Sequence, residues 1–313
     1  MRRTALACGL LTAALALSAC SGSGDDDRPG GGDRTASNAP GRSTGPAATE
    51  RPSSSATAQP TSPDERPTAA HTPVETTPAP PKRWQPSPGV AWQWQLDGEV
   101  TPSVDVPVYD IDGFENTAAD VARLHRAGRK AICYINVGAW ENYRPDKNAF
   151  PKSVLGAGNG WAGERWLDIR RLDVLRPIME HRFDMCRTKG FDAVEPDLVE
   201  GYANKTGFPL TAADQLAYNR MIADIAHERG LAVGLKNDLP QIPQLLSHFD
   251  FAVNEECAQY DECGQLRPFT AADKAVFHVE YEVPNSKFCA ESRKLKLSSM
   301  SKKLDLGVWR RPC

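Results

Sequence analysis

Aromatic residues are absent between Ser21 and Pro81, and Val74 is the only aliphatic side chain larger than alanine in that stretch. The same stretch contains 11 prolines and many Ser, Thr and Gly residues. Such a composition cannot bury enough apolar surface to offset the entropy lost on ordering. We therefore predict a disordered linker over residues 21–83 that holds a folded domain at a distance, and an O-glycosylated stalk remains open as an alternative.

A hydrophobic run long enough to cross a bilayer is also lacking, because the apolar stretch from Ala5 to Ala16 is too short. Arg2 and Arg3 precede that stretch, and Leu17-Ser18-Ala19-Cys20 follows it. This order resembles a bacterial lipoprotein signal peptide over residues 1–20, with cleavage before Cys20 and a lipid on its thiol. An ordinary secretory signal is the alternative. Both predict an exported protein, either anchored to the outer face of the cytoplasmic membrane or secreted.

Basic runs and metal-binding spacings are missing as well. The net charge is −3, which gives no reason to expect a nucleic acid partner. No CxxC pair occurs, so a zinc site is not expected, and we predict no cofactor and a monomer. Six cysteines remain after Cys20: Cys133, Cys186, Cys257, Cys263, Cys289 and Cys313. In an exported protein they predict disulfides, with 15 possible pairings left open.

All seven tryptophans lie between Trp84 and Trp309, so residues 84–313 form the predicted globular domain. Short apolar runs alternate there with amphipathic segments, which predicts a parallel sheet with helical crossovers. Eight candidate strands favour a (β/α)8 TIM barrel over a doubly wound sheet, since no glycine fingerprint follows the first strand. The strands are expected at 91–96, 106–111, 130–137, 191–194, 231–235, around 251, at 275–279 and at 304–309.

Polar side chains follow most of these predicted strands. In a TIM barrel the carboxyl ends of the strands converge on one face, which carries the active site. Two strands end in acids, at Glu195-Pro196-Asp197 and at Glu255-Glu256, and a pair of carboxyl groups is what glycoside hydrolysis needs. The other polar strand ends are Asp110, Asp112, Asn136, Lys236, Asn237, Asn254 and Glu280.

Several segments together resemble glycoside hydrolase family 114, the endo-α-1,4-polygalactosaminidases, over about residues 92–281. The segments are Val108-Tyr109-Asp110-Ile111-Asp112, Cys133-Tyr134-Ile135-Asn136-Val137-Gly138, Trp166-Leu167-Asp168-Ile169-Arg170, Gly190-Phe191-Asp192-Ala193-Val194-Glu195-Pro196-Asp197 and Val253-Asn254-Glu255-Glu256-Cys257. The resemblance implies a TIM barrel, a galactosamine-containing polysaccharide as substrate, and two catalytic carboxyl groups.

The resemblance assigns the catalytic roles to Asp197 as nucleophile and Glu255 as general acid and base. The sequence departs from the family pattern at Leu198, where Asn is expected, and at Glu256, where Gln is expected. We further predict that the substrate is bound by Tyr109, Asp110, Asp112, Tyr134, Asn136, Glu195, Tyr202, Lys236, Asn237 and Glu280. Two alternatives are a metal-dependent hydrolase, disfavoured because no histidine stands beside these acids, and a non-catalytic carbohydrate-binding lipoprotein with a barrel fold.

Overall fold

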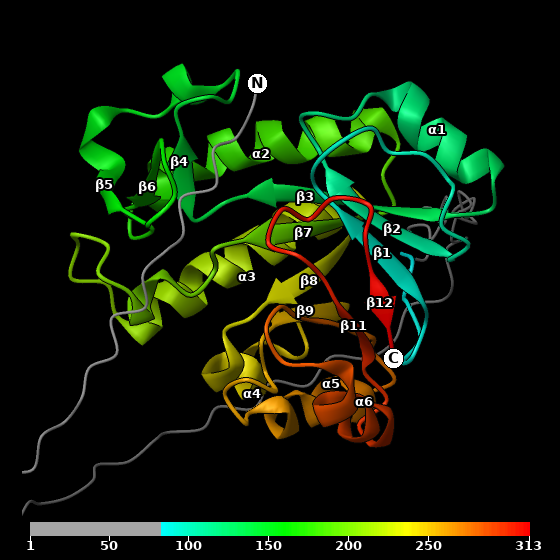
Figure 1. The fold of residues 1–313 in the computed structure, drawn as a ribbon. Coiled ribbons are helices and arrows are strands. Elements are labelled where there is room, and N and C mark those ends of the chain that lie inside the picture. Colours follow the sequence, from blue (N-terminus) through cyan, green and yellow to red (C-terminus); the bar gives the residue numbers. More distant parts are fainter. Residues whose placement is uncertain (1–82) are drawn as a thin grey trace, which may run out of the picture. The chain divides into compact units, whose positions relative to one another are not determined.

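The computed structural model describes residues 83–313. The predicted signal peptide, the lipid site at Cys20 and nearly all of the predicted linker lie outside the described residues. Eight parallel strands form one curved sheet in the order β1-β2-β3-β7-β8-β9-β10-β11, and a short antiparallel strand, β12, follows at the edge (Figure 1). Their bounds are β1 Trp92–Gln95, β2 Val108–Asp112, β3 Lys130–Asn136, β7 Ala193–Asp197, β8 Ala232–Lys236, β9 Phe251–Glu255, β10 Val276–Glu280, β11 Ser298–Ser301 and β12 Arg311–Pro312.

Helices connect the strands from β2 onward, so the predicted (β/α)8 TIM-barrel class is confirmed. They are α1 Ala118–Arg126, α2 Leu172–Lys189, α3 Ala212–Glu228, α4 Ile242–Leu245, α5 Arg267–Ala271 and α6 Asn285–Lys294. Short 3-10 turns occupy Lys147–Ala149, Lys152–Val154, Gly201–Ala203, Leu239–Gln241 and Cys263–Leu266. No helix in residues 83–313 combines the length and the apolar character needed to cross a membrane.

Local sequence explains where the longer helices begin and end. Thr117 and Thr211 cap α1 and α3, and each accepts a hydrogen bond from the backbone of an aspartate three residues later, whose carboxylate bonds back to the cap. This reciprocal arrangement satisfies backbone donors that a helix start leaves free. Helix α2 ends at Gly190, whose φ of 91° is readily adopted by glycine.

The seam of the barrel lies between β1 and β11, where the C-terminal segment inserts. The backbone N–H of Leu96 donates to Leu306 O at 2.9 Å, and Gln93 Nε2 donates to Val308 O at 2.9 Å. The predicted eighth strand at Leu304–Trp309 is therefore wrong: β11 at Ser298–Ser301 takes that place. Three of the four residues of β11 are serines, so its burial comes from its neighbours in the sheet and not from an apolar pattern of its own.

Two separate cores lie on the two faces of the sheet. One core faces the barrel axis and includes Trp92, Val108, Phe251 and Phe277. The other lies between the strands and the helices and includes Tyr109, Ile111, Cys133, Ile135, Val194, Leu235 and Val276 with residues of α2 and α3. Because neighbouring residues of a strand point to opposite faces, membership of one core or the other tells which residues face the axis.

A small antiparallel sheet, in the order β4-β6-β5, is inserted between β3 and α2. It consists of β4 Ala139–Glu141, β5 Leu155–Gly158 and β6 Glu164–Leu167. The sequence predicts only a long loop here, with an extended piece at 166–169. In Figure 1 this sheet lies on the side toward which the arrowheads of β3 and β8 point.

Three disulfides use the six cysteines of the described chain. Cys133 of β3 is bonded to Cys186 of α2, Cys257 to Cys263, and Cys289 of α6 to Cys313. The prediction that these cysteines pair is confirmed, and the pairing that the sequence left open is now defined. The third bond ties the C-terminal segment to α6, next to the seam of the barrel.

Candidate active site

The axis-facing residues become polar toward the carboxyl ends of the strands. On β7 the series runs from Ala193 to Glu195 and Asp197, and on β9 it runs from Phe251 through Val253 to Glu255. The same period of two places Asp110, Asp112, Tyr134, Asn136, Lys236 and Tyr281 on this face. The register therefore brings the predicted catalytic pair and most of the predicted binding residues together.

Lys236 lies at the centre of this group. Its Nζ is 2.9 Å from Glu195 Oε1, 2.9 Å from Asp197 Oδ1 and 3.2 Å from Glu255 Oε2. The Lys236 side chain is 2% exposed, whereas those of Asp197 and Glu255 are 16% and 26% exposed. Burial alone would lower the pKa of Lys236, but the three carboxylates raise it well above its usual value. Lys236 is thus a permanent buried cation beneath two accessible acids.

Two tyrosines and a tryptophan complete the surroundings of the pair. Tyr134 donates to Asp197 Oδ2 at 2.8 Å, and the Tyr281 hydroxyl donates to Glu255 Oε1. Burial, and then the charge of the neighbouring acid, raises the pKa of both tyrosines well above the usual value, so both stay hydrogen-bond donors. The ring of Trp94 lies 4.7 Å from Lys236 Nζ and forms a cation–π contact beneath it.

Asp110 and Glu195 form a buried pair below the accessible acids. Both are fully buried, and Asp110 has no basic partner among residues 83–313. Burial, together with the negative charge of Glu195, raises the pKa of Asp110 well above its usual value. Glu195 pairs with Lys236 from below, and with 0% exposure neither Asp110 nor Glu195 is placed to touch a substrate.

Asp112 and Asn136 connect the barrel to the inserted sheet. Arg144 binds Asp112 through two nitrogens, at 3.0 and 2.6 Å, and also binds Glu141 of β4 at 2.9 Å. Asn136 accepts the backbone N–H of Ala139 at 2.8 Å. Both side chains are buried, so their contacts hold β4 against the barrel top.

Tyr109, Glu280 and Asn237, also predicted to bind the substrate, make their contacts outside the group around Lys236. Tyr109 faces the helices, and its hydroxyl donates to Val104 O at 2.8 Å. Glu280 also points outward, where it bonds His278 and the backbone N–H of Ala258. The side chain of Asn237 accepts the backbone N–H of Glu255 at 3.0 Å, so it positions the end of β9. The outward orientation of Tyr109 and Glu280 follows from strand alternation, which puts them on the face opposite Asp110 and Tyr281.

A left-handed backbone follows each of the three charged strand ends. Leu198 after Asp197 has a φ of 61°, Asn237 and Asp238 after Lys236 have 48° and 47°, and Glu256 after Glu255 has 61°. This conformation is costly for residues other than glycine and concentrates at functional sites. It turns the chain sharply away just beyond the residues that meet at Lys236.

Sequence reasoning missed four groups near the pair: Tyr281, Arg144, Glu200 and Asp238. Glu200 stands on the loop after β7, where burial, with the charge of Asp197 next, raises its pKa to about 8. Asp238 is 3% exposed and bonds Asn219 and the predicted sugar-binding residue Tyr202; burial raises its pKa to about 7. Extending the prediction from each charged strand end to the next acidic residue of the following loop would have identified Glu200 and Asp238.

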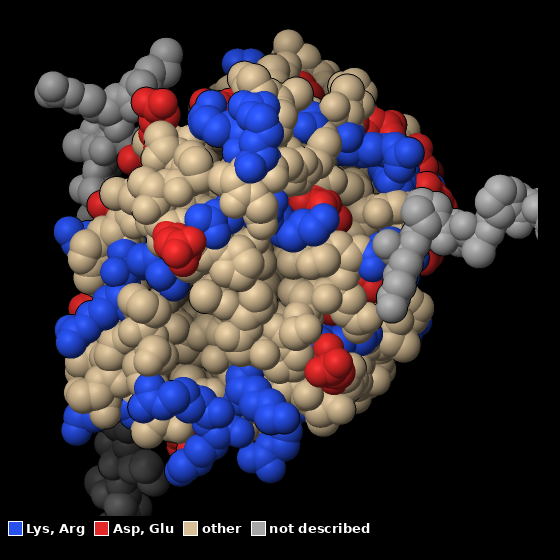
Figure 2. All heavy atoms as spheres, turned by 90° about the vertical axis from the view of Figure 1, so that its right-hand side faces the viewer, with Lys and Arg blue, Asp and Glu red and all other residues tan. Residues whose placement is uncertain are grey.

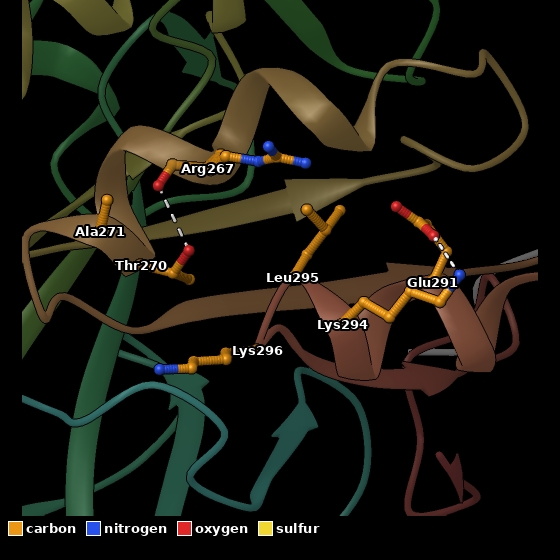
Figure 3. A pocket seen from close by; sticks show the side chains of 7 residues that line it. All are labelled: Arg267, Thr270, Ala271, Glu291, Lys294, Leu295 and Lys296. Carbon is orange, nitrogen blue, oxygen red and sulfur yellow. Dashed lines mark hydrogen bonds and ion pairs between the residues drawn. The ribbon is translucent and has the colours of Figure 1, made fainter.

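Other features of the described residues offer no competing site. Cys257, Cys263 and His278 lie close enough to hold a metal, but the two sulfurs are bonded to each other. A hollow of about 270 Å³ between α5 and α6 is lined by Arg267, Lys294 and Lys296, but Figure 3 shows Arg267 and Lys296 pointing away from each other. On the face seen in Figure 2, turned away from the β3 and β8 arrowheads, Lys and Arg side chains are plentiful.

Comparison with known proteins identifies the family. The model of glycoside-hydrolase family GH114 matches residues 73–313, and the chain belongs to that family. It is therefore a glycoside hydrolase. Ega3 of Aspergillus fumigatus, solved in complex with galactosamine, is 40% identical with a TM-score of 0.70, over 74% of this chain and 97% of that one.

A second solved structure shows the fold alone. The glycoside hydrolase domain of PelA from Pseudomonas aeruginosa is 14% identical with a TM-score of 0.55, over 71% of this chain and 96% of that domain. A search among curated proteins found no match. Family membership favours a glycoside hydrolase over a non-catalytic carbohydrate-binding protein.

Proposed function

We propose that this hydrolase cleaves α-1,4-linked galactosamine-containing polysaccharide, with Asp197 as nucleophile and Glu255 as general acid and base. The observation that carries this proposal is the contact of both carboxylates with the one ammonium group of Lys236. Support for the substrate comes from the similarity to Ega3, a structure that contains galactosamine. The exposed carboxylates and the buried cation match the need for two reactive acids held in fixed positions.

The spacing of the two acids favours retention of the anomeric configuration. Their contacts with Lys236 Nζ, at 2.9 and 3.2 Å, limit their nearest oxygens to a separation of about 6 Å at most. Retaining enzymes hold the two carboxyl groups about 5–5.5 Å apart, whereas inverting enzymes need roughly 6.5–9.5 Å to admit a water. That limit is compatible with the shorter spacing, and we therefore propose a covalent intermediate on Asp197.

The reaction then takes two steps. An Asp197 oxygen bonds to the anomeric carbon as the bond to the leaving sugar breaks, and Glu255 gives its proton to the leaving oxygen. Glu255, now a carboxylate, takes a proton from water, whose oxygen bonds to the anomeric carbon and frees Asp197. Tyr134 and Lys236 orient Asp197, and Tyr281 orients Glu255.

Product analysis on de-N-acetylated polygalactosamine tests this function. Wild type is expected to release oligosaccharides with the anomeric configuration retained, as NMR of the first products would show. Asp197→Asn and Glu255→Gln are expected to lose at least about a thousand-fold in kcat. Equal activity of either variant and wild type would refute the catalytic assignment.

We also propose that the enzyme is exported and tethered through a lipid on Cys20, as a monomer. The order of charges, apolar residues and cysteine at the N-terminus supports this location. Metabolic labelling with a radioactive fatty acid, compared between wild type and Cys20→Ser, tests it. Unlabelled wild-type protein would contradict the lipid anchor.

A further inference from the structure

Negative charge exceeds positive charge around Asp197. Lys236 pairs with Glu195, Asp197 and Glu255. Within residues 83–313, no Lys, Arg or His forms an ion pair with Glu200 or Asp238. A buried acid without a cation is costly when ionised, so both groups favour their protonated forms unless a cation from outside the protein reaches them.

Glu200 is the better placed of the two to meet a ligand. It stands three residues after Asp197, is half-buried, and no donor of the described residues reaches its Oε2. Its backbone is fixed, because Glu200 O accepts Ala203 N–H and Asn204 Nδ2, both at 3.1 Å. The groups that face its carboxyl electrostatically are Asp197 of β7, Lys236 and Asp238 from the end of β8, and Glu255 of β9.

Asp238 instead supports the neighbouring tyrosine. It lies almost fully buried and accepts Asn219 Nδ2 at 3.0 Å, and burial, followed by the charge of Asp238, raises the pKa of the neighbouring Tyr202. The backbone N–H of Tyr202 also donates to Gln215 of α3, at 3.3 Å. Tyr202 is thus held in place two residues from Glu200, with a ring that can stack on a sugar.

We propose that Glu200 binds the protonated amino group of the galactosamine residue whose anomeric carbon is attacked, and thereby selects free amino sugars over N-acetylated ones. This inference rests on the proposed function. The amino group stands on the carbon next to the anomeric carbon, so a residue that recognises it must lie beside the nucleophile. An acetamide is neutral and would leave the Glu200 carboxyl without its partner, which is the kind of mismatch that gives strong discrimination.

The test compares kcat/KM on de-N-acetylated and on fully N-acetylated oligogalactosamine for wild type and Glu200→Gln. The variant is expected to lose roughly ten- to hundred-fold on the amino substrate, mainly through KM, and to change less than about two-fold on the acetylated one. Glu200→Asp keeps the charge and should retain part of the preference. Asp261→Asn removes an exposed charge elsewhere and is the matched control, with an unchanged preference.

Asp238→Asn separates selection from positioning. If Asp238 only holds Tyr202, this variant raises KM for both substrates by a similar factor and leaves the preference intact. An equal loss of preference in Asp238→Asn and Glu200→Gln would overturn the assignment to Glu200.

Two further outcomes distinguish the inference from the function on which it rests. Wild type that cleaves the amino polymer, with a Glu200→Gln variant of unchanged preference, overturns this inference alone. Wild type that cleaves neither substrate overturns both. If the Glu200→Gln variant fails to fold, inhibition of the wild-type enzyme by free sugars tests the proposal instead. Galactosamine is expected to inhibit at least about ten-fold better than galactose. Equal inhibition by the two sugars would refute the proposal.

Discussion

The ammonium nitrogen of Lys236 lies 2.9 Å from Oδ1 of Asp197, beneath the carboxylate that we expect to attack the sugar. The contact keeps a fixed, buried positive charge next to the nucleophile. Such preorganised charge is worth more there than at an exposed position, because water does not screen it.

Replacing Lys236 with Met is therefore expected to lower kcat by about a hundred-fold or more. The replacement leaves Glu195, Asp197 and Glu255 to repel one another without a cation between them. Steady-state kinetics on the amino polymer would measure this. Lys303→Met, at an exposed lysine above Trp309, is the control and should leave kcat unchanged. A Lys236→Met enzyme with near-normal kcat would contradict the role of this cation.

Leu198 should respond favourably to replacement by Asn. Its φ of 61° is unfavourable for leucine, and asparagine tolerates it better. The turn packs directly against Gly138, where an added Cβ would lie 1.7 Å from Leu198 O. We expect Leu198→Asn to raise the free energy of unfolding by about 1 kcal/mol, and Leu198→Val to lower it, since a β-branched residue fits this conformation worst. Thermal melts would show it; a fall in Tm for Leu198→Asn would argue against strain at this position.

Stability is expected to fall as the pH rises from about 4 to about 8. Burial raises the pKa of Glu200 to about 8 and that of Asp238 to about 7, above the values near 4 of unfolded chains. Folding then takes up protons between the two pKa values. The stabilisation is therefore complete below the pKa of the unfolded chain, and it is lost as the pH rises through the pKa of the folded protein. Urea unfolding at a series of pH values would measure the slope. Glu200→Gln and Asp238→Asn should each flatten it, and an unaltered slope in both would refute the shifts.

The bond between Cys289 and Cys313 should stabilise the seam of the barrel. It closes a chain separation of 24 residues, for which the entropy model gives about 3.5 kcal/mol. A Cys289→Ser/Cys313→Ser variant should lose about this much in denaturant unfolding. Hydrogen exchange should also speed up at the backbone N–H of Leu96, which donates to Leu306 O across the seam. Unchanged exchange at Leu96 would show that the segment holds its place without the disulfide.

The parts of the site that strand periodicity governs were predictable. Asp197, Glu255 and Lys236 each end an apolar run, and the expectation that parallel strands bring their ends together is met by their shared contact at Lys236. The same periodicity, applied strictly, would have turned Tyr109 and Glu280 away from the site. The prediction included them because it counted polar strand ends without assigning each to a face.

The remaining parts depended on contacts between distant segments. Ser298–Ser301 became a buried strand because β10 supplies its hydrogen bonds on one side and the C-terminal segment covers the other, while the more apolar run at 304–309 stayed largely exposed. Asp112 is held by Arg144 of the loop after β4, a pairing for which no local pattern exists. Likewise, Glu200 carries no motif of its own.

The sequence by itself determined the alternation of strands and helices, the two acids at strand ends and the even set of cysteines, because these depend on local periodicity and composition. Only the tertiary structure decided which acids keep a cation and which do not. Ion pairing depends on the approach of side chains from different strands to within a few ångströms. Lys236 pairs with Asp197 and Glu255, whereas Glu200 forms no ion pair with any residue from 83 to 313.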